Sequence, residues 1–324
     1  MRVGAHVSIA GRVYEAIPRA VAIGCECLQI FVGSPRMWRP VSYSPADLAE
    51  FRRRRARAGL DPLVAHAAYL VNLASPDPKV FRRSVESLTH TARAVDALDG
   101  LGAITHLGSA RGAAWDACCR RIAVALRRVL AGSSRAMVLL EGSAGGTIGG
   151  TFEELRDILD AAGQSPRLGV CLDTAHLFAA GWDIRTPRGV AEMVEAFDRR
   201  VGLRWLRVLH FNDSKTPLGS RLDRHENIGE GRIGRAGFRA VFSHPALRAV
   251  PGVIETPGFY QHGPDRRNVT ALKRLRALAH RSSAAAGPFP PGGSASTAPP
   301  RARRVRSRTA AAGSSARPAA PVAR

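Results

Sequence analysis

The sequence predicts an α/β protein built as a single (β/α)8 TIM barrel. Eight short apolar runs, each of strand length and most of them rich in Val, Ile and Leu, recur through the first 255 residues. Segments with helical patterning separate them. Strands that alternate with crossover helices form a parallel sheet, and eight such units close into a barrel. The predicted strands cover residues 3–7, 27–32, 63–66, 103–107, 137–141, 168–173, 206–211 and 252–255.

Start signals mark three of the helices between these strands. Each signal contains a side chain that can accept a hydrogen bond from a backbone N–H of the first turn. In two of them a proline follows, and its fixed φ angle suits the first helical position. They occur at Ser44-Pro45, Thr151 with Glu154, and Thr186-Pro187. The first of these helices ends at Gly59 and carries the run RRRRAR at 52–57. We expect this run to be a solvated outer face.

The composition changes sharply after the last predicted helix. Residues 282–324 consist almost wholly of Ser, Ala, Gly, Pro and Arg. Such a segment buries too little apolar surface to offset the chain entropy of folding. We therefore expect a barrel domain over 1–281 and a disordered tail over 282–324, which is either a solvated extension or a loose electrostatic tether for nucleic acid.

The bulk composition favours a cytoplasmic protein without a membrane partner. The 324 residues are 45% hydrophobic and 23% charged, and no run approaches the roughly 20 apolar residues that span a bilayer. The N-terminus lacks the basic and apolar regions of a signal peptide. The five cysteines form no CxxC pair, which agrees with reduced thiols.

The chain is strongly basic, with a net charge of +22. Eight arginines and no acid occur from residue 281 onward, so residues 1–280 carry the remaining +14. Arginine used for solubility by a GC-rich genome is one explanation. A polyanionic partner, most simply nucleic acid, is the explanation that bears on function.

Six successive predicted strands carry a His, Asp or Glu at or near their C-terminal end. In a barrel this edge is the active-site face. A single histidine at a strand end is usually structural, but six ionisable residues in succession favour a shared site, because each costs stability if left unpaired. They are His66, His106, Glu141, Asp173, His210 and Glu255.

Two closely spaced pairs add to this set. Asp173 and His176 stand three apart after a strand, and Asp223 and His225 stand two apart on a loop, where alternation would point Arg224 outward. Nitrogen and carboxylate donors without thiolate favour zinc or manganese. Nine donors are more than one tetrahedral ion can bind, so they suit two or three ions that share a bridging carboxylate. Clusters of this type favour phosphoryl chemistry.

Five stretches are similar to the endonuclease IV family (deoxyribonuclease IV, AP endonuclease family 2) of the xylose isomerase-like barrels. The resemblance covers roughly residues 1–280. It is carried by GAHVS at 4–8, HAAYLVNLASP at 66–76, GVCLDTAHLFAAGWD at 169–183, HFNDSKTPLGSRLDRHENIGEGRIG at 210–234 and IETP at 254–257.

This resemblance implies a centre of three zinc ions, with Mn²⁺ as an alternative at one of them. The first ion would be held by His66, His106 and Glu141. The second would be held by Glu141, as a bridge, with Asp173, His210 and Glu255. The third would be held by His176, Asp223 and His225. Among these ligands the predicted catalytic residues are Glu141, His106 and Asp223.

The implied activity is that of a metal-dependent endodeoxyribonuclease in base excision repair. It would hydrolyse the phosphodiester 5′ to an abasic (AP) site, leaving a 3′-hydroxyl and a 5′-deoxyribose phosphate, and would trim blocked 3′ ends. The implied partner is damaged double-stranded DNA, entered by Arg36, Tyr69 and Leu70. We also expect Lys215 to contact a phosphate. The family implies a monomer acting on the nucleoid of a bacterial cytoplasm.

Two alternatives stay open at this point. A metal-dependent sugar isomerase or epimerase of the same barrel superfamily would need neither Asp223 and His225 nor a basic body. A non-catalytic DNA-binding barrel would not need nine ligand-type residues. The chain also departs from the family pattern at Leu107, Gly142 and Ala175. These changes remove no ligand, but they put rate and substrate preference in question.

Overall fold

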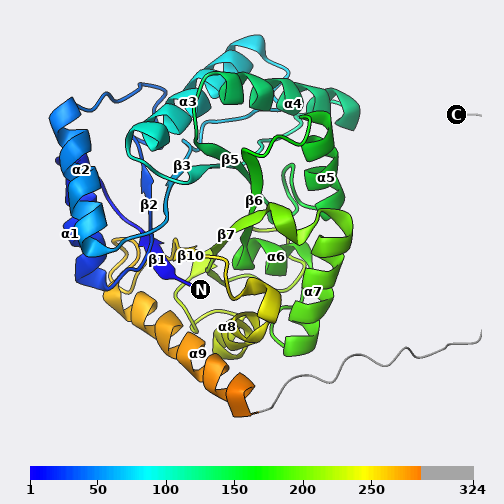
Figure 1. Cartoon of the computed structure of the whole chain (residues 1–324). Coiled ribbons are helices and arrows are strands. Elements are labelled where there is room, and N and C mark those ends of the chain that lie inside the picture. Colours follow the sequence, from blue (N-terminus) through cyan, green and yellow to red (C-terminus); the bar gives the residue numbers. More distant parts are fainter. Residues whose placement is uncertain (286–324) are drawn as a thin grey trace, which may run out of the picture. The chain divides into compact units, whose positions relative to one another are not determined.

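The computed structural model of the protein describes residues 1–285 and contains a closed barrel of eight parallel strands, as predicted. Figure 1 looks into this barrel, with the strands at the centre and the helices around them. Around the barrel the strands follow the order β1-β10-β7-β6-β5-β4-β3-β2. Their bounds are β1 (Val3–His6), β2 (Leu28–Phe31), β3 (Leu63–His66), β4 (Gly102–Thr105), β5 (Met137–Glu141), β6 (Leu168–Asp173), β7 (Leu206–His210) and β10 (Gly252–Ile254).

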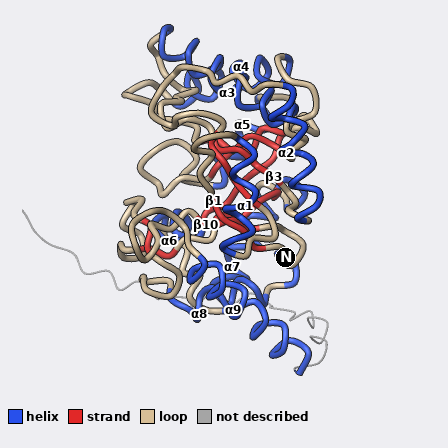
Figure 2. The backbone as a smooth tube through the Cα atoms, turned by 90° about the vertical axis from the view of Figure 1, so that its left-hand side faces the viewer, coloured by secondary structure: helices blue, strands red, loops and turns tan. Residues whose placement is uncertain are grey.

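The helices form the outer layer of the barrel, and the long connecting loops lie mainly on the side away from the N-terminus (Figure 2). The helices are α1 (Ala16–Ile23), α2 (Pro45–Ala58), α3 (Pro78–Ala97), α4 (Trp115–Ala131), α5 (Phe152–Ala161), α6 (Thr174–Ala180), α7 (Pro187–Arg200), α8 (Gly234–Ser243) and α9 (Arg266–Ala285). Within residues 1–285 no helix is both long and apolar enough to cross a membrane. The predicted tail begins at residue 282, but α9 continues to Ala285, and residues 286–324 lie outside the described part of the chain.

The three predicted helix starts are confirmed. The side-chain oxygens of Ser44, Thr151 and Thr186 each accept a hydrogen bond from a backbone N–H of the first turn. One detail differs from a reciprocal capping box. The carboxylate of Glu154 accepts the backbone N–H groups of Gly149 and Gly150, at 2.8 and 2.9 Å, and so fixes the loop before the helix.

The predicted solvated face at 52–57 on α2 is only partly solvated. Arg53 is exposed and pairs with Glu50 at 2.7 Å. By contrast, only 12% of the Arg55 side chain is exposed, and its guanidinium donates to the carbonyl oxygen of Leu98. The run therefore has side chains that face solvent and one that joins α2 to the C-terminal end of α3.

The barrel interior contains an apolar layer to which seven strands contribute one side chain each. It consists of Cys27, Val64, Ile104, Leu139, Cys171, Val208 and Val253. Side chains along a strand alternate between the two faces, so the residue two positions further on also faces inward. Those positions hold Gln29, His66, His106, Glu141, Asp173, His210 and Glu255. A polar layer thus lies directly next to the apolar one, at the C-terminal ends of the strands.

A long loop follows β7 and folds back over the barrel mouth. It contains a small antiparallel hairpin of β8 (Asp213–Ser214) and β9 (His225–Glu226). The buried carboxylate of Asp213 accepts backbone N–H groups of Gly229, Gly231 and Ile233 at 2.9 to 3.1 Å. At Gly231 a Cβ would lie 2.5 Å from this carboxylate, so only glycine fits. These contacts fix the shape of the loop that carries Asp223 and His225.

Glu26 ties α9 to the N-terminal end of the barrel. Its carboxylate accepts from Arg276 at 2.6 Å and from the backbone N–H of Val3 at 3.0 Å, and it lies 3.2 Å from Lys273. Burial raises the pKa of Glu26, but these donors outweigh it and lower the pKa to about 2. The stabilisation is therefore complete above pH 4.5, the ordinary pKa, and is lost as the pH falls toward 2.

We expect Glu26→Gln to lower the free energy of unfolding at pH 7 by about 1 to 2 kcal/mol, a modest value because 31% of the side chain is exposed. Urea unfolding at pH 7 and pH 3 measures the difference between variant and wild type, which should narrow at the lower pH. Glu192→Gln, which removes an exposed pair on α7, is the matched control. An equal difference at both pH values would contradict the assigned role.

Candidate metal centre

The first cluster joins the ends of β3, β4 and β5. Ligand atoms of His66, His106 and Glu141 all lie within 4.8 Å of one another. Nε2 of His66 is 3.0 Å and Nε2 of His106 is 3.5 Å from Oε2 of Glu141. Both His66 and Glu141 are buried, whereas 35% of the His106 side chain is exposed. The cluster therefore has one side open to the barrel mouth.

The second cluster shares Glu141 with the first. It combines Glu141 with Asp173, His210 and Glu255, again with ligand atoms within 4.8 Å. Nδ1 of His210 is 2.9 Å from Oε1 of Glu141 and 3.3 Å from Oε2 of Glu255. The two oxygens of Glu141 thus face different clusters, which is the arrangement expected of a bridging carboxylate.

The third cluster lies under the loop after β7. His176 and His225 group with Asp173 within 4.8 Å. Asp223 also lies close to both imidazoles, at 3.2 Å from Nε2 of His176 and 3.1 Å from Nε2 of His225. All nine predicted ligands therefore gather at the barrel mouth, and Asp173 stands between the second and third clusters.

Hydrogen bonds to backbone carbonyls turn the Nε2 atoms of two histidines toward the carboxylates. A carbonyl oxygen only accepts, so Nδ1 of His66, 2.7 Å from the Ala67 carbonyl, carries the proton, as does Nδ1 of His176, 2.8 Å from the Gly142 carbonyl. Their Nε2 atoms point at carboxylates, and each can hold either a second proton or, when a cation is bound, the lone pair that coordinates it. Nε2 of His176 and of His225 are buried without a hydrogen-bond partner among the described residues. Imidazole nitrogens that converge with carboxylates fit a bound cation, which would replace the second proton of each ring.

The close approach of imidazoles and carboxylates shifts the pKa values of both kinds of group. Burial lowers the pKa of His176, but the carboxylates of Asp173 and Asp223 outweigh it and raise the pKa to about 10. The same balance raises the pKa of His225 to about 9. Burial raises the pKa of Glu141, and the imidazoles of His106 and His210 bring it well below its usual range. Protons and metal ions therefore compete for these positions, and metal affinity should fall as the pH falls.

Three supporting residues were not predicted from the sequence. Gln29 donates to Oε1 of Glu255 and faces Nε2 of His210, at 2.9 Å, with its amide oxygen. Asn212 donates to Asp173 at 2.6 Å and accepts the backbone N–H of Glu255 at 2.8 Å. Thr174 accepts the backbone N–H of Asn212. For Gln29 the signal was available, because a polar residue interrupts an apolar strand run.

A cleft of about 990 Å³ opens above the three clusters. Arg36 and Tyr69 line its rim, and Leu70 lies exposed beside Tyr69. Arg224, predicted to point outward, is exposed but also belongs to the cleft lining. Lys215 is exposed on the same loop and lies 3.9 Å from Glu226, outside the cleft.

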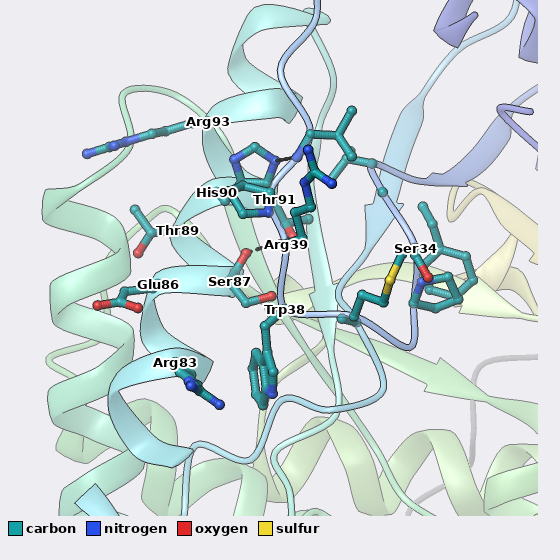
Figure 3. A pocket seen from close by; sticks show the side chains of 18 of the residues that line it. Ser34, Trp38, Arg39, Arg83, Glu86, Ser87, Thr89, His90, Thr91 and Arg93 are labelled. Atoms are coloured by element: carbon teal, nitrogen blue, oxygen red, sulfur yellow. Dashed lines mark hydrogen bonds between the residues drawn. The ribbon is translucent and has the colours of Figure 1, made fainter. Parts of the chain in front are cut away.

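A second pocket of about 440 Å³ lies between the loop after β2 and helix α3 (Figure 3). Trp38 lines it and packs partly buried against the core, so its role is to support the loop that carries Arg36. His90 of α3 accepts the backbone N–H of Val41 and fixes the other end of the loop. The loop with the predicted DNA contact is therefore anchored on both sides.

Comparison with known proteins places this centre in a family. The model of the xylose isomerase-like TIM barrel matches residues 17–278. A probable endonuclease 4 of Methanoculleus marisnigri is 42% identical over 277 residues, covering 84% of this chain and 98% of that protein. The chain belongs to the endonuclease 4 family.

Solved structures agree with this family assignment. Endonuclease IV from Thermus thermophilus has a TM-score of 0.75 and 36% identity, covering 87% of this chain and 100% of that one. A D-tagatose 3-epimerase-like protein covers 88% of this chain and 99% of its own, with a TM-score of 0.64. At 19% identity it shares the barrel fold alone.

The departures from the endonuclease 4 pattern leave the clusters intact. Leu107 and Ala175 are buried apolar side chains. At Gly142 the contact to His176 is made by the backbone carbonyl, which any residue would supply. The nine ligand positions therefore depend on none of these three side chains.

Proposed function

We propose that the protein is a zinc-dependent endonuclease that hydrolyses DNA on the 5′ side of abasic sites in base excision repair and also trims blocked 3′ ends. The single observation that carries the proposal is the set of three adjoining clusters built from nine His, Asp and Glu side chains. Bound there, metal ions would activate water as the nucleophile and stabilise the departing oxygen.

The donor set supports zinc, with Mn²⁺ as an alternative at one site. Imidazole and carboxylate ligands suit both ions. We assign the first ion to His66, His106 and Glu141. The second is assigned to Glu141, Asp173, His210 and Glu255. The third is assigned to His176, Asp223 and His225. Gln29 and Asn212 hold these side chains in place, so little reorganisation is needed for binding.

The rim of the cleft supports recognition of damaged duplex DNA. Tyr69 is 60% exposed, and its ring packs edge-on against Phe31 with centroids 5.3 Å apart. The backbone N–H of Tyr69 donates to the Pro35 carbonyl at 3.0 Å, which joins its loop to the loop of Arg36. We assign Arg36, Tyr69 and Leu70 to entering the duplex at the flipped nucleotide. Lys215 is assigned to a phosphate, and the protein is expected to act as a monomer.

The protein side chains would hold the metal ions and orient the scissile phosphate. Glu141 keeps its negative charge, because the pKa of this carboxyl lies well below its usual range, and so serves the first and second clusters together. His176 and His225 direct their Nε2 atoms at Asp223 on the wall of the cleft, where a scissile phosphate would enter. No nucleophilic cysteine is assigned to this cleft, since Cys27 and Cys171 lie in the apolar layer below it.

The sugar epimerase alternative has less support. The barrel fold is common to both classes, so the fold does not decide between them. The third cluster, with Asp223 and His225 on a loop over the mouth, adds donors beyond those of the first two clusters. The basic body of the chain likewise suits a polyanion better than a neutral sugar.

The deciding experiment uses a duplex with one tetrahydrofuran abasic analogue. We expect incision on the 5′ side of the analogue, loss of incision in excess chelator, and recovery on adding Zn²⁺. An undamaged duplex of the same sequence is the control. Conversion of ketose sugars without incision of the abasic duplex would establish the epimerase alternative instead. Binding of the duplex without incision at any metal concentration would favour a non-catalytic DNA-binding barrel.

A further inference from the structure

Most large apolar side chains that are exposed on the described part of the chain lie on loops at the C-terminal rim. They are Met37, Val41, Tyr69, Leu70, Leu218, Leu222 and Tyr260. The most exposed of them is Tyr260, at 81%, on the loop after β10. A group of exposed apolar side chains on one rim, unlike single ones scattered over a surface, indicates an interaction site. Tyr260 has not been given a role by the metal centre, since it does not line the cleft.

Tyr260 borders a shallow depression of about 550 Å³, which we name the Tyr260 patch. Its defining residues are Arg235, Phe259, Tyr260, Arg267 and Arg274. Arg235 lies in the first turn of α8, and the other two arginines lie in the first three turns of α9. Both helices begin where strands of the barrel end, so the patch belongs to the same rim as the metal centre.

The arginines of the patch are free to bind an anion. Among residues 1–285 no carboxylate lies within ion-pair distance of Arg235, Arg267 or Arg274. The guanidinium of Arg267 stacks 3.6 Å above the ring centre of Phe259. Stacking holds the group flat and leaves its N–H donors in the plane, where they match a phosphate.

The acidic side chains of the patch do not cancel this charge. Asp265 already accepts the backbone N–H groups of Phe259 and Asn268, at 2.7 and 2.9 Å. Glu230 is exposed at the edge. Arg266, the fourth arginine in the lining, donates to the carbonyl of Ala22. The lining holds four arginines and two carboxylates in all, a formal charge of 4 − 2 = +2.

The patch is continuous with the metal cleft. Gln261 and His262 line the cleft and directly follow Tyr260 in the same loop. Tyr260 therefore stands next in the chain to residues that line the cleft. Basic side chains interleaved with an aromatic ring are the combination that holds a nucleic-acid backbone and stacks on its bases or sugars.

We propose that the Tyr260 patch binds the DNA that flanks the incised nucleotide, with Arg235, Arg267 and Arg274 on phosphates and Tyr260 against a sugar or base. This inference rests on the proposed function, because it takes DNA as the polyanion. The patch extends the bound length of DNA beyond the cleft, and it does not act on the reacting phosphate.

The test compares two tetrahydrofuran duplexes with the zinc-loaded full chain. One has about 30 base pairs, and the other has about 10, so that its arms reach only about 17 Å to each side of the lesion. We expect Tyr260→Ala and Arg267→Ala each to raise KM on the long duplex about five- to tenfold, with kcat unchanged. On the short duplex both variants should match the wild type. Tyr260→Phe, which keeps the ring, and Arg239→Ala, one turn further along α8, are the controls.

A binding measurement separates this inference from the proposed function. With an undamaged long duplex, Arg267→Ala should reduce the slope of log Kd against log salt concentration by about one. An unchanged slope together with an unchanged KM on the long duplex would overturn the proposal. If the wild type cut neither duplex, the proposed function would fail, and the salt slope would still decide whether the patch binds DNA.

Discussion

Replacing Glu141 by Gln is expected to lower kcat/KM for an abasic duplex about a thousandfold or more, which corresponds to roughly 4 kcal/mol of transition-state stabilisation. Oε2 of Glu141 lies 3.0 Å from Nε2 of His66, and Oε1 lies 2.9 Å from Nδ1 of His210. Glutamine keeps the shape of the side chain but loses the charge and one accepting oxygen. A single substitution therefore removes an anionic ligand from two clusters at once.

The Glu141→Gln prediction is checked by steady-state cleavage kinetics together with metal content per chain by emission spectrometry. The matched control is Glu154→Gln, whose carboxylate accepts two backbone N–H groups on the loop after β5 and contacts no cluster. We expect this control to retain its metal and to lose less than about tenfold in rate. Thermal unfolding followed by circular dichroism shows whether both variants fold. A Glu141→Gln protein with full metal content and full rate would contradict the bridging role.

Replacing His225 by Ala is expected to lower kcat about a hundredfold or more while changing the affinity for abasic DNA only a few fold. Nε2 of His225 is 3.1 Å from Asp223 and 3.6 Å from Asp173, and it is buried without a hydrogen-bond partner among the described residues. Its loss leaves the third cluster with one imidazole, whereas the rim residues assigned to the duplex stay in place.

The His225→Ala experiment measures binding and cutting separately, by anisotropy titration and by single-turnover cleavage. Metal content should fall by about one ion per chain, with the other two clusters retained. His280→Ala, an exposed histidine on α9, is the matched control and should change neither quantity. Full single-turnover activity in His225→Ala would remove the third cluster from the mechanism. A parallel loss of affinity and rate would instead assign His225 to substrate binding.

The barrel and the ligand positions were predictable because both depend on strand periodicity. Eight apolar runs indicated eight strands, and alternation along each strand brings its terminal His, Asp or Glu inward. The same alternation applies to Gln29, two residues after Cys27 of the apolar layer. Gln29 does not stand out among the ionisable residues at the other strand ends because its amide carries no charge, although it hydrogen-bonds both Glu255 and His210.

The loop after β7 was not predictable in the same way. Its shape depends on one carboxylate, Asp213, that accepts backbone N–H groups sixteen to twenty residues later in the chain. Backbone donors carry no sequence signal, and only the glycines at 229 and 231 mark where the chain passes close. The hydrogen-bond donors of Glu154 were unpredictable for the same reason. The capping motif of Thr151 and Glu154 identifies the carboxylate but not the backbone N–H groups that it accepts.

The polar layer is completed only late in the synthesis of the chain. Its candidate ligands run from His66 to Glu255, and each of β3 to β7 and β10 has one at its C-terminal end or directly after it. A nascent chain that has not yet delivered Glu255 lacks both the last ligand and the strand that closes the ring between β7 and β1. A fragment that ends before Glu255 therefore lacks a complete second cluster and a closed barrel, and we expect it to lack the proposed activity.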